Sequence, residues 1–91
     1  MYWMSRNALR ECVQRGYPVA GMKEVAAICS LYSGEHSDLA DIQKRAEDFV
    51  ETYKNRDVNA EEKEVEKDIA NALMQDFYDL DNKYKLGEEA E

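Results

Sequence analysis

The chain has 91 residues, of which 44% are hydrophobic and 10% aromatic, and its formal net charge is −8. This length allows one domain with one modest core, and the composition excludes wholesale disorder. No apolar run approaches the ~20 residues that a membrane span needs, and the first residues do not resemble a signal peptide. We therefore expect a cytoplasmic protein that does not bind membranes.

The charge is unevenly distributed along the chain. Residues 1–33 hold four basic and two acidic side chains, which gives +2, whereas the remaining chain holds eight basic and 18 acidic ones, which gives −10. A negative chain repels nucleic acid and attracts basic proteins at long range. We therefore expect a basic protein partner and no direct nucleic-acid binding.

Two helices are predicted in the first third of the chain. The first begins after Ser5, which can act as the N-cap, and ends at Gly16. A connection that contains Pro18 follows, because a helix cannot continue unbroken through it. The second helix is predicted at residues 20–32, with an apolar face that consists of Met22, Val25, Ala26, Cys29 and Tyr32.

Cys12 and Cys29 fit neither a metal-binding nor a redox spacing. Both lie at apolar helical positions, where a free cysteine behaves as a small buried hydrophobe. We expect free thiols, and a disulfide that joins the first two helices is the alternative.

Two longer helices follow. Ser37 is predicted to cap the third, whose apolar residues recur at steps of three and four: Leu39, Ile42, Ala46, Phe49, Val50 and Tyr53. Asn59 is predicted to cap the fourth, with Glu62 placed as in a capping box, and this helix extends to about Leu86. Its predicted buried stripe is Val65, Ile69, Leu73, Phe77, Leu80 and Tyr84.

These elements predict an all-α fold, because no segment has the alternation of a strand. The expected architecture is a small helical bundle of about four helices, two short at the N-terminus and two long and antiparallel at the C-terminus. Residues 1–87 are predicted to form a single helical domain, and residues 88–91 a disordered acidic tail.

The surface of the fourth helix contains the candidate binding residues. Four carboxylates are predicted to align outward into a ridge: Glu61, Glu64, Asp68 and Asp79. Met74 and Tyr78 lie beside the predicted stripe, where they either widen the core or form a second contact surface. Like charges also stack at i, i+4, as in Glu62 and Glu66, which reflects either neutral drift or a cluster that binds a partner's Lys and Arg.

The sequence contains no pattern typical of an active site. His36 is the only histidine, is expected in a solvated turn, and cannot build a common zinc site alone. The residues after Asp79 lack the ligands and the glycine of a calcium loop, and no glycine-rich phosphate loop occurs. We therefore expect no enzymatic activity, no cofactor and no metal site.

Three functional hypotheses follow. The favoured one is a non-enzymatic acidic module that inhibits or regulates a basic, nucleic-acid-handling protein, for example as a mobile-element inhibitor of host defence. The alternative is a self-associating assembly subunit with an aromatic and methionine interface: Tyr2, Trp3, Met4, Met74 and Tyr78. The third is a helix-turn-helix DNA-binding regulator, which is weakened because Lys23 is the single basic residue of the second helix.

Overall fold

The computed structural model describes residues 6–57 and 59–85, which form four α-helices without a strand. The helices are α1 (Arg6–Gln14), α2 (Pro18–Tyr32), α3 (Ser37–Tyr53) and α4 (Ala60–Tyr84). The all-α prediction is therefore confirmed. The two N-terminal helices are shorter than the two C-terminal ones, as expected, although α2 with 15 residues is nearly as long as α3 with 17. The predicted acidic tail lies outside the described residues.

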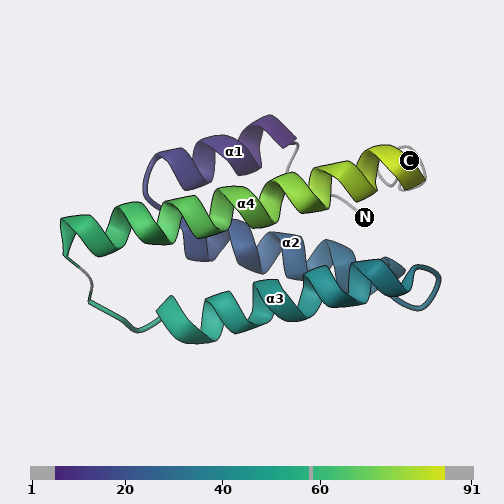
Figure 1. Cartoon of the computed structure of the whole chain (residues 1–91), viewed down its shortest axis with the longest axis horizontal. Helices are drawn as coiled ribbons and strands as arrows, with labels where there is room; N and C mark the ends of the chain where they lie inside the picture. The colour runs from purple at the N-terminus through teal and green to yellow at the C-terminus, as the bar shows by residue number, and fades with distance from the viewer. Residues whose placement is uncertain (1–5, 58, 86–91) are drawn as a thin grey trace.

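Consecutive helices run in opposite directions (Figure 1). The helix α2 contacts all three other helices, whereas α1 and α3 do not contact each other. The sequence suggested two long helices that pack mainly on each other, but α3 packs more extensively on α2 than on α4. The centre of the bundle is therefore α2.

The helix ends confirm some of the predicted caps and correct others. The side-chain oxygen of Asn59 accepts a hydrogen bond from the backbone N–H of Glu62 at 2.9 Å, as predicted. Ser37 is the first residue of α3, and the extended residue before it, His36, is the N-cap without a side-chain cap bond. The helix α2 starts at Pro18, two residues earlier than predicted, because proline suits the first helical turn. The predicted cap Ser5 lies outside the described residues.

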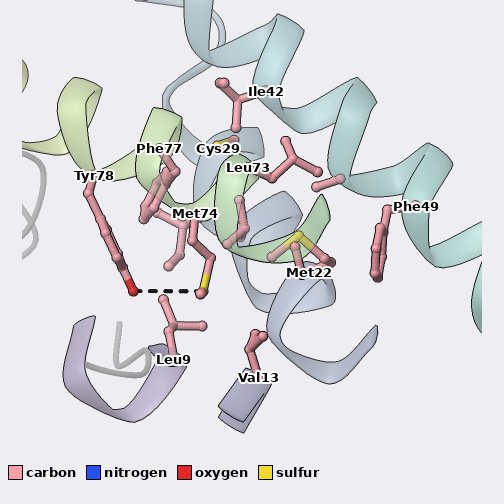
Figure 2. Packing of buried hydrophobic residues seen from close by; sticks show 14 of the residues in the cluster. Leu9, Val13, Met22, Cys29, Ile42, Phe49, Leu73, Met74, Phe77 and Tyr78 are labelled. Carbon is pink, nitrogen blue, oxygen red and sulfur yellow. Dashed lines mark hydrogen bonds between the residues drawn. The ribbon is translucent and has the colours of Figure 1, made fainter. Parts of the chain in front are cut away.

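All four helices contribute to one core (Figure 2). The predicted face of α3 is confirmed, since four of its residues are buried and Val50 and Tyr53 are half-buried. At the contact between α1 and α2, a Cβ on Gly21 would lie only 3.0 Å from Val13 Cγ2, so glycine allows this close approach. The core consists of Leu9, Val13, Met22, Val25, Ile28, Cys29, Leu39, Ile42, Ala46, Phe49, Ala70, Leu73, Met74, Phe77 and Tyr78.

The buried face of α4 is rotated relative to the prediction. Val65 and Ile69, predicted as core, are 54% and 41% exposed, whereas Met74 and Tyr78 are 2% and 5% exposed. The reason is that α4 packs between α1 and α3 and against α2, so its middle buries a wide face. Figure 2 shows Leu9 of α1 beside Met74 and Tyr78. Both residues belong to the core and not to an exposed contact surface.

The two cysteines are free thiols, as expected. Cys29 is fully buried, and this burial raises the pKa of its thiol to about 12. Cys12 is half-buried, and its thiol donates to the carbonyl oxygen of Tyr17 at 3.4 Å.

The rotation of α4 predicts opposite outcomes for two apolar truncations. Met74→Ala should lower the free energy of unfolding by about 2–4 kcal/mol, because it leaves a cavity in the core. Ile69→Ala should change it by about 0.5 kcal/mol or less, because Ile69 is on the surface and alanine favours helix. Urea unfolding followed by circular dichroism measures both, and a larger loss for Ile69→Ala would refute the rotation.

The two thiols should also differ in reactivity. At pH 8 a thiol reagent such as 5,5′-dithiobis(2-nitrobenzoate) should modify Cys12 well before Cys29, because Cys29 is buried and stays protonated. Both thiols should react quickly in denaturant, which provides the control. Equal rates in the native protein would contradict the burial of Cys29.

Candidate functional site

The predicted acidic ridge forms on the outward face of α4. Its four members, Glu61, Glu64, Asp68 and Asp79, are all exposed. Lys67 Nζ lies 3.8 Å from Glu64 Oε1, and Gln75 Nε2 donates to Asp79 Oδ1 at 3.0 Å. In the described part of the chain, the carboxylates of Glu61 and Asp68 have neither a hydrogen bond nor an ion pair. The ridge therefore presents carboxylates to the solvent.

An apolar groove that the sequence did not predict runs beside this ridge. Two hollows of about 440 and 250 Å³ lie between α3 and α4, share Tyr53, and are together called the α3–α4 groove. The larger is lined by Arg45, Asp48, Phe49, Thr52, Tyr53, Ile69, Ala72 and Leu73. The smaller is lined by Tyr53, Arg56, Glu62 and Val65.

Residue spacing places the groove and the ridge side by side on α4. Val65, Ile69 and Ala72 are separated by four and three residues and so follow one line along the helix. Glu61 precedes Val65 by four residues, and Asp68 follows it by three, so the ridge is adjacent to this line. The surface therefore combines exposed apolar side chains with unpaired carboxylates.

The ends of the groove carry charge as well. At one end Arg45 Nη1 lies 2.9 Å from Asp76 Oδ2, and both side chains are about half exposed. At the other end Glu62 and Arg56 line the smaller hollow. The charges that line the two hollows cancel, because Arg45 and Arg56 oppose Asp48 and Glu62, so the negative charge beside the groove is that of the ridge.

Sequence reasoning missed the groove because it assigned Val65 and Ile69 to the core. The sequence of the second half of α4 did contain a signal, because Leu73, Met74 and Phe77 define one apolar arc. All three residues are buried. The centre of that arc, extended back toward the N-terminus, passes near Glu66 and Ala70 and leaves Val65 outside.

Two carboxylates of α4 are buried, although the sequence predicted an exposed Glu66. Glu66 is 5% and Asp81 is 8% exposed. Asp81 has an interaction partner, whereas Glu66 has none within residues 6–57 and 59–85. Glu66 lines a separate hollow near the start of α2.

The sequence suggested a solvated histidine, but the ring of His36 packs against another side chain. The His36 ring stacks on the Tyr84 ring with a centroid distance of 3.7 Å and an interplanar angle of 14°. Tyr84 also donates its hydroxyl to Asp38 Oδ2 at 2.8 Å. The end of α4 is thus fastened to the start of α3. Joining the two helix ends is the structural role of this cluster.

The other sequence-based hypotheses gain no site. In the helix-turn-helix hypothesis α2 would be the DNA recognition helix, but it buries Met22, Val25, Ile28 and Cys29 in the core. The proposed contacts Tyr2, Trp3 and Met4 lie outside the described residues. Among residues that the structure describes, no three His, Cys, Asp or Glu side chains gather as metal ligands. In the same part of the chain, no helix combines the length and apolar character that a membrane span requires.

Comparisons with family models, curated proteins and solved structures give no match.

The contact between α3 and α4 can be tested at Tyr84. Tyr84→Phe should lower the free energy of unfolding by about 1–2 kcal/mol, because it removes a hydrogen bond to a carboxylate and keeps the ring stack. In the Asp38→Ala background, which lacks the acceptor, the same substitution should cost less. An equal loss in both backgrounds, measured by thermal unfolding, would contradict the hydrogen bond.

Proposed function

We propose that this protein is a non-enzymatic binding module that takes a basic, amphipathic helix of a partner protein into the α3–α4 groove. The supporting observation is that Val65 and Ile69 are 54% and 41% exposed directly beside the unpaired carboxylates of the ridge. The two apolar side chains gain little burial within this chain. Together with the ridge carboxylates they match a ligand with an apolar stripe and flanking cations.

The shape of the groove suits a helix. Between Glu62 and Ala72 the lining residues of α4 extend over about 15 Å, which corresponds to roughly three helical turns. Helix-in-groove recognition uses anchors at i, i+3 or i+4 and i+7 of the ligand, so two or three apolar side chains can reach the groove. Lys and Arg on the ligand would then meet the ridge carboxylates.

Charge makes a second copy of this chain a poor occupant. In a two-fold symmetric dimer each ridge residue would approach the same patch of the partner copy, so carboxylates would meet carboxylates. Like charges across an interface disfavour the complex. A basic partner avoids this cost and is attracted at long range.

The same electrostatics support a nucleic-acid-handling protein as the partner. Proteins that handle nucleic acids expose Lys- and Arg-rich surfaces, because phosphate contacts dominate their affinity. A module that covers such a surface blocks the nucleic acid and acts as an inhibitor or regulator. This is the function that we propose, and inhibition of a host defence protein is one instance of it.

A peptide experiment tests the groove. The probe is a synthetic helix of about 16 residues with leucines on one face and lysines beside them, and its control is a peptide of the same composition in scrambled order. We expect amide shift changes at Ile69 and Ala72, and roughly tenfold weaker binding by Val65→Ser/Ile69→Ser. Leu31→Ser removes an exposed apolar residue of α2 and should bind as the wild type does. Equal binding of both peptides would refute the groove.

Charge reversal tests the ridge in the same assay. Substitution of Glu61, Glu64, Asp68 and Asp79 by Lys should abolish binding of the amphipathic helix and leave the helix content unchanged. The matched control reverses Glu11, Glu35, Glu47 and Glu51, which changes the net charge equally on other surfaces. Equal losses in both variants would show that only the net charge matters.

A further inference from the structure

A third hollow lies at the end of the bundle where α2 and α4 begin and α3 ends. Its volume is about 350 Å³, within the range of roughly 300–1,000 Å³ typical of small-molecule sites. Glu66 and Lys63 line it from a side of α4 that faces α2, away from Val65. It is thus distinct from the α3–α4 groove, although Tyr53 and Arg56 border both.

The rim of this hollow is positive, in contrast to the rest of the protein. Lys23, Arg56 and Lys63 line it, and none of the three forms an ion pair with a described residue. Glu66 is the only carboxylate in the lining, so the local charge is +2 in a chain of net charge −8. Lys23 also borders a hollow with Glu47 and Glu51, and Arg56 one with Glu62, but none of the three cations is held in a direct ion pair that an anionic group would have to break.

The start of α2 adds to this positive rim. Tyr17 is the N-cap and provides no side-chain cap bond, and the first backbone bond of the helix joins the N–H of Gly21 to the oxygen of Tyr17 at 3.2 Å. The N–H groups of Val19 and Ala20 therefore belong to the uncapped first turn, and both residues line the hollow. Helix N-termini of this kind favour anions.

Glu66 provides the opposite charge at the inner wall. Glu66 as a whole residue is 5% exposed, and its carboxylate has no hydrogen bond or ion pair with any described residue. No fully enclosed polar side-chain atom of the described residues lacks a partner, so the Glu66 oxygens keep some access to solvent, and Glu66 lines the hollow. A carboxylate on a largely buried residue loses part of its hydration, and no described residue replaces that hydration here. A cationic group in the hollow would compensate for this loss.

We propose that this hollow binds a small zwitterion of the amino-acid type. Its ammonium group would pair with Glu66, and its carboxylate would lie between Lys63 and the first turn of α2. Tyr17 and Tyr53 provide aromatic surface for an apolar side chain. This inference does not depend on the proposed protein-binding function.

Three related molecules separate the two charges. L-Phenylalanine has both charges, phenethylamine has only the ammonium group, and 3-phenylpropionate has only the carboxylate. In ¹H–¹⁵N correlation spectra, phenylalanine should shift the amides of Val19, Ala20 and Glu66 and bind at least tenfold more tightly than either analogue. No shift at these amides with up to about 10 mM of each compound, or equal affinity for all three, would overturn the proposal.

Substitutions assign each charge to a residue. Glu66→Gln should weaken phenylalanine binding at least tenfold and leave 3-phenylpropionate binding unweakened. Lys63→Met should weaken both carboxylate ligands and spare phenethylamine, and Lys44→Met, an exposed cation elsewhere on α3, should change nothing. Unchanged phenylalanine binding by Glu66→Gln would overturn the proposal.

A melting experiment without ligand distinguishes a ligand site from a structural ion pair. Glu66→Gln keeps the size of the side chain and removes its charge. It should melt at the same or a higher temperature than the wild type, because the lost charge had no partner. A clearly lower melting temperature would show that Glu66 is held by a partner within the chain, and this result would also overturn the proposal.

Discussion

Leu73, Met74, Phe77 and Tyr78 lie along the second half of α4 and pack into the core that the other three helices share. This packing fixes the rotation of α4 about its own axis, because the helix is rigid over its 25 residues. The direction in which each residue of the first half points is therefore set by the packing of the second half and not by the residues around it in the sequence. Val65 and Ile69 are turned outward, Glu66 is turned inward, and the acidic ridge is left facing water. Both proposed binding surfaces are consequences of this one packing.

The parts of the fold that the sequence predicts well are those that depend on neighbours along the chain. The cap at Asn59 needs only the residue three positions later, and the stripe of α3 reads correctly because that helix buries one narrow side. The rotation of α4 depends on α1, which covers Met74 and Tyr78 from a direction that the periodicity of α4 does not reveal. The exposure of the ridge carboxylates was predictable, because they lie opposite the large apolar residues under either rotation.

The groove and the hollow near α2 were not predictable, because each combines residues that are distant in sequence. The hollow joins Lys23, Arg56 and Glu66, and no pattern within any one helix brings them together. The stack of His36 on Tyr84 has the same origin, since it requires the end of α4 to meet the start of α3. A net charge of −8 therefore hides two local environments of opposite sign. The two proposed ligands, a small zwitterion and a basic helix, would therefore occupy different parts of the same molecule.

The limited attachment of α1 has a consequence for partial unfolding. This helix has nine residues, contacts α2 and α4 but not α3, and contributes Leu9 and Val13 to the core of the described residues. A helix of this length is not stable alone, so it persists only through these contacts. Detachment of α1 would leave the contacts among α2, α3 and α4 in place, and such sub-global openings cost less than complete unfolding. Opening of this helix would give the solvent transient access to the sulfur of Met74 and the ring of Tyr78. Because the same opening exposes the backbone of α1, amide exchange along α1 would be faster than in the other three helices.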